Sequence, residues 1–455
     1  MSAAAKPRVS VIMANYNGAA HIGAAISSVL VQSMPDLELI VSDDGSSDES
    51  VAIVERMMKR DPRLRLVEAT ANGGPAAARN RALDVAIGEW IAIVDADDIL
   101  HPQRFERLIE AAHDMNYTGV ADDLIYFRET PGYRPETLLG QQFPKGSFEV
   151  TAAQMVDTQN GSQPPFGYLK PILRRDHLEA LRYREDIRIG EDHDLYLRFL
   201  LNGGRLRVLR QSYYLYRRHG QSVSHRFTPD DVEGMIRVQD DLKQGYPDMD
   251  HELTALMESR ARLLNKSLAY EKVVQDLKNR RYTGALAKLG RKPTLTAKLA
   301  RSVKEHVAKR RMNGDGGADL PKNVVLLAEG QRIDDFPSAA RQARQIAVPR
   351  AGESWDAEDW ARVTASSNPA SVFAQGEAGV FALGFLPDWN VAHLLPEDGA
   401  WPDAARKLAS LHGSQVSDAG PGGKIVRLED VERPARQRDQ AADTGTQADN
   451  AQMRP

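Results

Sequence analysis

Cysteine is absent from this chain of 455 residues. Without thiols the chain forms no disulfide and no thiolate metal site, and its composition suits a reducing compartment. No stretch approaches the roughly 20 apolar residues that cross a bilayer, so we expect no transmembrane helix. Residues 1–8 are small and polar, so we also expect no signal peptide. These absences predict a cytoplasmic protein.

A strong excess of either charge is missing as well. The 59 Lys and Arg residues nearly balance the 63 Asp and Glu residues, and the formal net charge is −4. Such a balance gives no global attraction to polyanions, so we expect no nucleic-acid partner. The length exceeds that of one ordinary domain, and two or three structural units are expected.

Two short apolar segments near the N-terminus flank a helical pattern. Residues 9–13 and 37–41 have the composition of buried strands, and apolar side chains recur with helical periodicity over residues 21–31. Turn-forming residues follow the first strand, and acidic residues follow the second. A strand, a helix and a strand in this order predict a βαβ unit and an α/β fold.

The most informative segment is an apolar run that ends in three carboxylates. Residues 90–94 predict a buried strand, and Asp95, Asp97 and Asp98 follow it directly. Clustered carboxylates repel one another and are costly to desolvate unless a cation neutralises them. Mg²⁺ prefers one or two carboxylates together with phosphate oxygens. A solvated acidic loop is the alternative, and this motif by itself leaves both interpretations open.

The loops after the three predicted strands are expected to meet in one crevice, because ligands of open α/β sheets bind beyond the carboxyl ends of the strands. These loops supply an aromatic ring at Tyr16, carboxylates at Asp43 and Asp44, and the acidic cluster of residues 95–98. A ring for a base, acids for base or ribose hydrogen bonds, and metal carboxylates for a diphosphate together predict a sugar-nucleotide site.

At this point the sequence resembles the family-2 glycosyltransferases, whose catalytic domain has the GT-A fold, a Rossmann-like α/β fold. The resemblance spans roughly residues 7–226, and residues 167–174 and 214–219 look most like bacterial exopolysaccharide transferases of the succinoglycan type. The matching motifs are Val9–Asn17, Val41–Asp48, Gly73–Asn80, Gly88–Asp98 and Gly190–Asp194. One departure is Ala14, which stands at a nucleotide-binding position where many relatives have Thr or Ser, so no hydroxyl contact is expected there.

The resemblance implies roles for the nucleotide-binding residues. Tyr16 would stack on the uracil of a UDP-sugar, and Asp44 would accept a hydrogen bond from the uracil N3–H, with Asp43 as the neighbouring alternative. Arg79 would approach the diphosphate. On the residues alone, Arg79 could instead pair with Asp84 on its own helix, a common surface arrangement that is worth little energy.

The resemblance also implies a divalent metal, Mg²⁺ or Mn²⁺. Asp97 would bind the ion directly, and Asp95 would contact the ribose or a metal-bound water. Asp98 is expected to point elsewhere and to support the loop. His219 is a candidate third metal ligand or diphosphate contact, although a lone histidine is as often structural.

A second acidic segment, residues 191–194, precedes an apolar helical pattern at residues 195–201. Acidic residues at a helix N-terminus are ordinarily caps and dipole partners. Three acids in four residues exceed what capping needs. The resemblance implies that Asp192 is the general base, with Glu191 as the alternative or as a partner that orients the acceptor.

The expected activity is an inverting, non-processive transfer of a sugar, with glucose as the first expectation, from a UDP-sugar to a growing lipid-linked oligosaccharide or glycan. Processive synthases of this fold add membrane spans and a Gln-x-x-Arg-Trp motif, and both are missing here. Two alternatives stay open on the sequence. One is a nucleotidyltransferase, and the other is a catalytically inactive sugar-nucleotide-binding scaffold.

Four segments are expected along the chain. Residues 1–228 form the catalytic domain, and residues 229–313 are helical. Within them, residues 278–311 are basic and amphipathic, which predicts a peripheral contact with the inner face of the cell membrane or, as the alternative, a solvated charged face. Residues 320–431 predict a small α/β domain, and residues 432–455 have the composition of a disordered tail.

Overall fold

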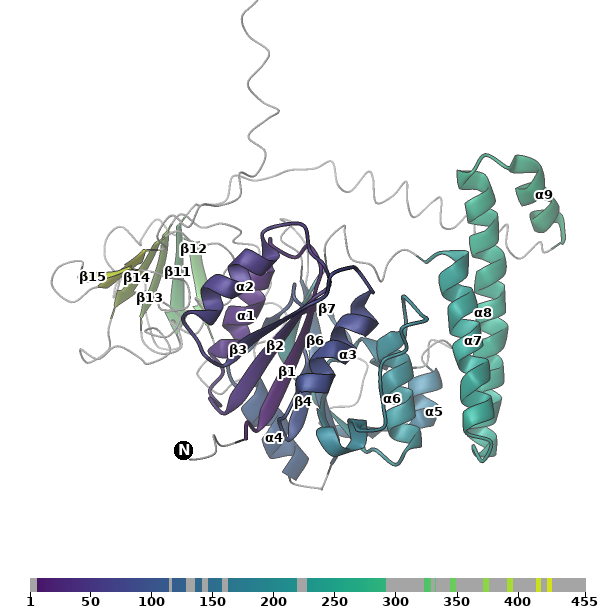
Figure 1. Cartoon of the computed structure of the whole chain (residues 1–455), viewed down its shortest axis with the longest axis horizontal. Coiled ribbons are helices and arrows are strands. Elements are labelled where there is room, and N and C mark those ends of the chain that lie inside the picture. Colours follow the sequence, from purple (N-terminus) through teal and green to yellow (C-terminus); the bar gives the residue numbers. More distant parts are fainter. Residues whose placement is uncertain are drawn as a thin grey trace, which may run out of the picture.

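The computed structural model shows an N-terminal α/β unit, a helical segment and a second sheet (Figure 1). Beyond residue 291 it describes Arg332 and six short strands. Before that point, the described residues are 6–113, 117–127, 136–140, 146–157, 163–218 and 227–291.

Among the described residues, ten strands form one mixed sheet, with β3-β2-β1-β4-β9-β6-β10-β5 as its main order and β7 and β8 paired to β6 and β10. The strands are β1 (Val9–Asn15), β2 (Leu37–Asp43), β3 (Leu64–Glu68), β4 (Trp90–Ile93), β5 (Ile99–Leu100), β6 (Gly119–Phe127), β7 (Glu136–Thr137), β8 (Phe148–Val150), β9 (Ile172–Arg174) and β10 (Leu206–Arg217). The first four strands are parallel to one another, as the predicted βαβ unit requires.

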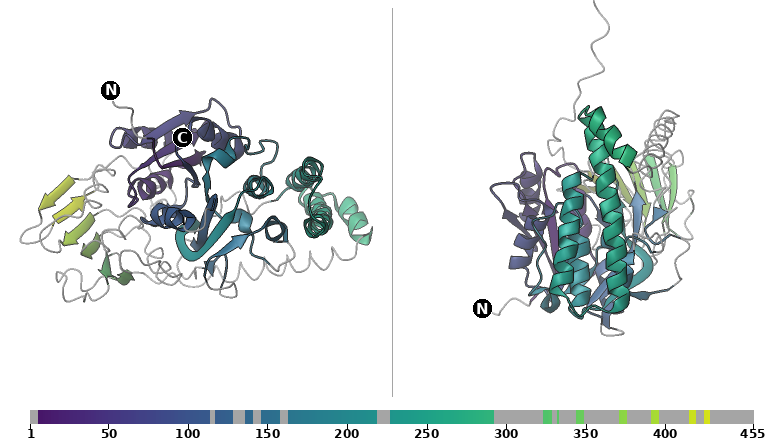
Figure 2. Two further views of the ribbon diagram at one scale, coloured as in Figure 1. Left: turned by 90° about the horizontal axis from the view of Figure 1, so that it is seen from below. Right: turned by 90° about the vertical axis from the view of Figure 1, so that its right-hand side faces the viewer.

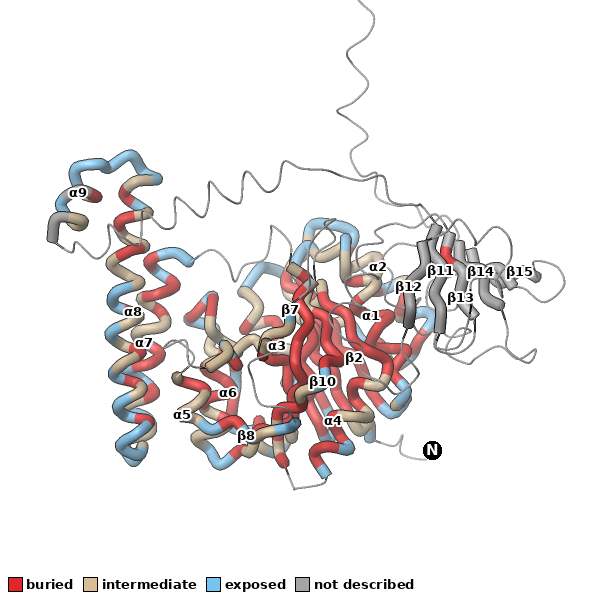
Figure 3. The backbone as a smooth tube through the Cα atoms, turned by 180° about the vertical axis from the view of Figure 1, so that it is seen from behind, coloured by how far each residue is buried: buried red, intermediate tan, exposed pale blue. Residues whose placement is uncertain are grey.

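The central strands lie in the buried core of the molecule (red in Figure 3). Every residue of β2 is buried, and so is every residue of β1 except Ala14. Helices and loops cover the sheet, which explains why these strands read as continuous apolar runs rather than as an alternating pattern. The helices of this unit are α1 (Ile22–Leu30), α2 (Ser50–Met58), α3 (Pro75–Val85), α4 (Arg104–His113), α5 (Ala152–Val156) and α6 (Glu191–Leu201).

The register of the strands determines which loops meet at the carboxyl edge. Strand β1 pairs in parallel with β2, with Asn15 opposite Asp43, and with β4, with Ile12 opposite Ile93. The loops that follow these three strands therefore lie side by side, as predicted. Strand β9 runs antiparallel to β4, with Ala92 opposite Ile172. This pairing brings the residues just before β9 next to the loop that follows β4.

Three helices follow the first sheet: α7 (Pro229–Gly245), α8 (His251–Lys278) and α9 (Tyr282–Arg291). Figure 2 shows α7 and α8 lying side by side, and helical structure was predicted here. Most of the basic amphipathic segment, from residue 292 onward, lies outside the described residues. No helix in the part of the chain that the structure describes has the length and apolarity of a membrane span.

The six strands beyond residue 291 form a second sheet in the order β12-β11-β13-β14-β16-β15. These strands fall within residues 320–431, and the predicted tail, residues 432–455, lies outside the described residues. The strands are β11 (Asn323–Ala328), β12 (Arg344–Val348), β13 (Ser371–Gln375), β14 (Val391–Leu395), β15 (Gln415–Asp418) and β16 (Lys424–Arg427).

A fully buried ion pair joins α4 to β6. Arg104 donates from Nε and Nη2 to Oδ1 of Asp122 at 3.0 and 2.8 Å, and neither side chain has exposed surface. The backbone N–H of Tyr213 donates to the other oxygen of Asp122 at 2.8 Å. Arg104 also donates to the backbone carbonyl of Lys170 and lies over the ring of Tyr214 at 4.8 Å. One guanidinium therefore contacts three other segments of the chain.

We expect Asp122→Ala to lower the free energy of unfolding by about 3–5 kcal/mol, because it leaves the guanidinium of Arg104 buried without its counter-charge. Urea unfolding followed by circular dichroism measures the change. Glu110→Ala is the matched control, since it removes an exposed carboxylate that pairs with Arg107 at 3.0 Å. That variant should change the free energy by less than about 0.5 kcal/mol. Equal, small effects of the two substitutions would contradict the structural role of the buried pair.

Candidate active site

A network of five charged side chains lies at the carboxyl edge of the first sheet. Arg79 donates from Nη2 to Oδ1 of Asp95 at 2.8 Å and from Nη1 to Oε1 of Glu191 at 2.9 Å. The ammonium of Lys170 lies 2.8 Å from Oδ2 of Asp95 and 2.9 Å from Oδ2 of Asp192. Both cationic side chains are buried. Two cations thus join the acidic loop after β4 to the acidic start of α6.

Arg79 and Glu191 stand 112 positions apart in the sequence, so the fold alone brings them together. Arg79 lies in α3, and Glu191 is the first residue of α6. The apolar pattern at residues 195–201 predicted this helix. The alternative in which Arg79 pairs with Asp84 is wrong. The carboxylate of Asp84 instead accepts from Arg182, at 3.1 Å from Nε.

The electrostatics of this network favour charged forms at its centre. Burial by itself would lower the pKa of Lys170, but Asp192 and Asp95 outweigh it and hold that pKa well above its ordinary value. Burial would likewise raise the pKa of Asp95, yet Lys170 and Arg79 hold it well below its usual range. Glu191 differs, because burial and the neighbouring Asp192 raise its pKa despite the contact with Arg79.

The guanidinium of Arg79 lies over an aromatic ring. The guanidinium carbon lies 5.3 Å from the ring centroid of Tyr183. The backbone of Tyr183 is fixed in turn by Asn80, which accepts from its N–H at 2.8 Å and donates to its carbonyl at 3.0 Å. A cation over an aromatic face is stabilised by about 0.5–2 kcal/mol, with the larger values where water is excluded. The sequence alone does not indicate a role for Tyr183, because no local pattern links it to residue 79.

The two oxygens of Asp192 have different surroundings. Oδ2 accepts from the ammonium of Lys170 at 2.9 Å. Oδ1 is buried and has no hydrogen bond among the described residues, and it lies 3.5 Å from Nη1 of Arg79. Asp192 therefore presents one oxygen whose lone pairs are open to a proton. Glu191, by contrast, uses its Oε1 to accept from Arg79.

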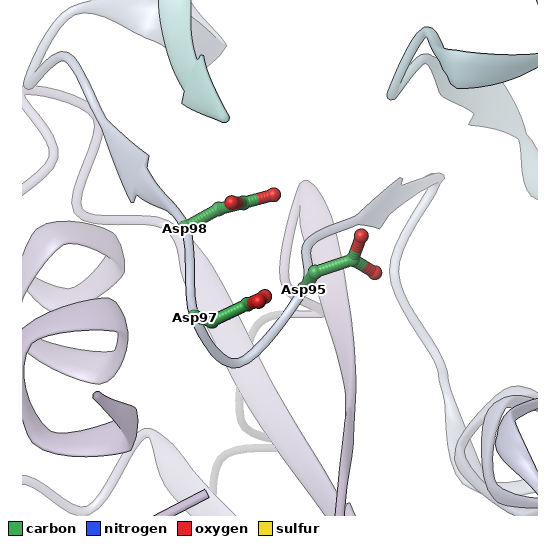
Figure 4. Close-up of side chains that lie close together, drawn as sticks. All are labelled: Asp95, Asp97 and Asp98. Atoms are coloured by element: carbon green, nitrogen blue, oxygen red, sulfur yellow. The ribbon is translucent and has the colours of Figure 1, made fainter. Parts of the chain in front are cut away.

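The acidic loop after β4 gathers three carboxylates (Figure 4). Oxygen atoms of Asp95, Asp97 and Asp98 lie within 4.8 Å of one another. Asp98 is buried, where it accepts from the hydroxyl of Tyr214 and from the backbone N–H of Arg217, each at 2.7 Å. Burial, followed by the charges of Asp97 and Asp95, raises the pKa of Asp98 well above its ordinary value.

This donor set suits a hard divalent cation. After burial, repulsion from Asp97 and Asp95 raises the pKa of Asp98, and a bound cation would relieve that repulsion. Asp98 already supports the loop through Tyr214 and Arg217, and Asp95 pairs with Arg79 and Lys170. His219, the candidate third ligand, lies outside the described residues. Arg217 donates from Nε to the carbonyl of Asp97 at 2.6 Å.

The two acids after β2 hold neighbouring loops in place. Oδ2 of Asp43 accepts from the side chains of Asn15 and Ser46, each at 2.7 Å. Oδ2 of Asp44 accepts from the backbone N–H groups of Gly73 and Gly74 at 2.9 and 2.7 Å. Both carboxylates are buried. The sequence analysis expected them to face the nucleotide and missed this loop-closing role.

Asp44 holds the start of α3 in place and thereby sets the position from which Arg79, a residue of that helix, reaches the charged network. Gly74 is the residue before this helix and has a φ of 89°, which favours glycine. Arg81 from the second turn of α3 also donates to Asp44, at 2.7 Å from Oδ1. The expected stacking residue, Tyr16, directly follows β1, and 53% of its surface is exposed. Ala14 lies in β1, one residue before the strand ends.

The chain is similar in sequence to known glycosyltransferases. Residues 10–175 match the model of glycosyl transferase family 2. The succinoglycan biosynthesis protein ExoO of Rhizobium meliloti is 33% identical over 62% of this chain and 80% of its own length. ExoU of the same organism, also a succinoglycan biosynthesis protein, is 32% identical over 50% of this chain and 67% of its own length.

A solved structure of Staphylococcus aureus TarS 1–349 aligns with 62% of this chain and 79% of its own, at 21% identity and a TM-score of 0.47. On the sequence matches, the chain belongs to glycosyltransferase family 2. It is a sugar-transferring enzyme whose catalytic domain has the GT-A fold, as the order of the parallel strands and the acidic loop after β4 require.

Proposed function

We propose that this enzyme transfers a sugar from a UDP-sugar to a growing lipid-linked oligosaccharide, with inversion and one sugar per acceptor, in bacterial exopolysaccharide or cell-surface polysaccharide synthesis. The names of ExoO and ExoU as succinoglycan biosynthesis proteins support the pathway class. Glucose is the first sugar to test. The observation that carries the proposal is the position of Asp192: its Oδ1 has no hydrogen bond among the described residues, and its Oδ2 pairs with Lys170, which also pairs with Asp95 of the acidic loop.

On the donor side, Tyr16 offers an exposed ring for the uracil. Asp44, or Asp43 beside it, would accept from the uracil N3–H through a remaining lone pair, since a carboxylate has about four acceptor positions. Arg79 would donate to the diphosphate. Asp97 would hold Mg²⁺ or Mn²⁺, which when bound would stabilise the negative charge of the departing diphosphate. Asp95 would contact the ribose or a water of that ion.

On the acceptor side, Oδ1 of Asp192 would take the proton of the attacking hydroxyl. A bond forms between the acceptor oxygen and the anomeric carbon, the bond from that carbon to the diphosphate oxygen breaks, and UDP leaves from the opposite face. The configuration at the sugar carbon is therefore inverted. A carboxylate is adequate as this base, because proton transfer accompanies attack on a carbon that already carries positive charge.

The two alternatives are weaker. A nucleotidyltransferase is disfavoured by membership of a sugar-transferring family. An inactive scaffold is disfavoured by the retention of Asp97 and Asp192 in one connected site. Hydrolysis of the donor separates all three, because a glycosyltransferase releases free sugar and UDP slowly, and only when metal is present.

We expect Asp97→Asn to abolish metal-dependent donor binding and to leave the fold intact, because removing one of three clustered charges relieves repulsion. Titration calorimetry with UDP, with and without Mn²⁺, measures the binding, and thermal unfolding checks the fold. Asp230→Asn, at an exposed position in the first turn of α7, is the matched control. A variant that binds UDP and Mn²⁺ as tightly as the unaltered enzyme would rule out Asp97 as the ligand.

Asp192→Asn should retain UDP binding and lose donor hydrolysis by roughly 10²–10⁴-fold, the usual cost of removing a general base. Release of UDP from a panel of UDP-sugars with Mn²⁺ supplies the rate, and UDP-glucose is the first member of the panel. Glu191→Gln is the comparison variant and should be less damaging. If Glu191→Gln proves the more damaging change, the base is Glu191.

A lipid-linked acceptor requires contact with the inner membrane surface, and we propose that the basic residues 278–311 provide it. Each cation near an anionic leaflet contributes about 1 kcal/mol, so attachment should be peripheral and salt-sensitive. Sedimentation with phosphatidylglycerol vesicles should pellet the protein at low salt and release it at high salt, with phosphatidylcholine vesicles as the control. Replacing the lysines and arginines of this segment by glutamine should abolish pelleting. Unchanged pelleting of that variant would leave the solvated-face interpretation standing.

A further inference from the structure

Lys170, like Arg79, contacts both halves of the site. Its ammonium lies 2.8 Å from Asp95 and 2.9 Å from Asp192, and only 4% of the side chain is exposed. Asp95 belongs to the donor side of the proposed reaction, and Asp192 belongs to the acceptor side. No role for this lysine follows from the functions described so far.

The backbone of Lys170 is held on two sides. Arg104, itself in the buried pair with Asp122, donates to the carbonyl of Lys170. The hydroxyl of Tyr196 on α6 donates to the carbonyl of Leu169 at 3.1 Å. The stem of the lysine therefore starts from a fixed point, while its four methylene groups let the ammonium shift between neighbouring acceptors.

The charge balance of the network makes such a shift favourable when a donor arrives. Three carboxylates, those of Asp95, Glu191 and Asp192, share two cations, which leaves one negative charge in excess. A diphosphate that enters beside Asp95 adds further negative charge. Phosphate oxygens and the carboxylate of Asp192 then compete for the same ammonium. Oδ1 of Asp192 has no hydrogen bond among the described residues, so Asp192 loses its strongest contact when Lys170 moves.

We propose that Lys170 is a positioning residue that couples donor binding to release of the base. In the nucleotide-free enzyme, Lys170 and Arg79 neutralise Asp192. A nucleoside diphosphate engages Lys170 and frees Asp192 to accept the acceptor's proton, so donor binds before acceptor. This inference rests on the proposed function, because it takes a nucleoside diphosphate as the donor group and Asp192 as the base.

The test compares the affinities of UDP and UMP, which differ by the β-phosphate, in titration calorimetry with saturating Mn²⁺. Lys170→Gln should weaken UDP binding roughly tenfold or more, the size expected for one charged hydrogen bond, and change UMP binding much less. Lys170→Arg keeps the charge and should restore most of the preference for UDP. Lys272→Gln is the matched control, since it removes a half-exposed lysine of α8 that pairs with Glu233.

Asp192→Asn tests the competition directly. Once Asp192 no longer attracts the ammonium, UDP should bind about two- to tenfold more tightly, the net value of one hydrogen bond. Equal losses of UDP and UMP affinity in Lys170→Gln would show a purely structural lysine and overturn the proposal. Unchanged UDP affinity in Asp192→Asn would overturn the coupling. If the unaltered enzyme binds no uridine nucleotide, the proposed function itself fails, whereas the other two outcomes leave it standing.

Discussion

The guanidinium of Arg104, which has no exposed surface, is the interaction on which the site depends. Asp122 neutralises it, and burial still raises the pKa of that carboxyl above its usual value. Through its remaining contacts, Arg104 fixes the carbonyl of Lys170 and packs on the ring of Tyr214. The hydroxyl of Tyr214 in turn donates to Asp98 and accepts from the backbone N–H of Asp95, at 2.7 and 3.2 Å. One buried charge therefore supports both the lysine that bridges the site and the acidic loop.

The clustered carboxylates of the site must be neutralised by neighbouring cations. Carboxylates that serve a metal and a proton transfer must lie close together, and buried like charges are costly unless cations answer them. Arg79 and Lys170 neutralise Asp95 and Asp192 directly, whereas Asp98 accepts hydrogen bonds from uncharged donors. The cations that neutralise these carboxylates are also those that the diphosphate of the proposed donor would attract. Under the proposed function, the stability of the free enzyme and its affinity for the donor would depend on the same side chains.

The acids after β2 show how one motif performs two tasks. Asp44 closes onto the glycines that start α3, and this contact sets the position from which Arg79 reaches the network. Asp43 ties the end of β1 to the turn at Ser46. Under the proposed function this loop also faces the nucleotide and must be rigid, and the buried carboxylates supply that rigidity through hydrogen bonds to backbone and side-chain donors.

The sequence by itself determined the βαβ start, the acidic loop after residues 90–94 and the helix that begins at Glu191, because these depend on local periodicity and on residue types at fixed spacing. Five motifs in order along the sequence also indicated the family. Only the tertiary structure decided which charges meet. Lys170 lies in the stretch 167–174 that the resemblance covers, but no residue pattern links it to Asp95, which it reaches because β9 runs antiparallel to β4. Arg79 pairs across 112 positions rather than with Asp84, since long-range packing, not helical spacing, sets the neighbours of a buried cation.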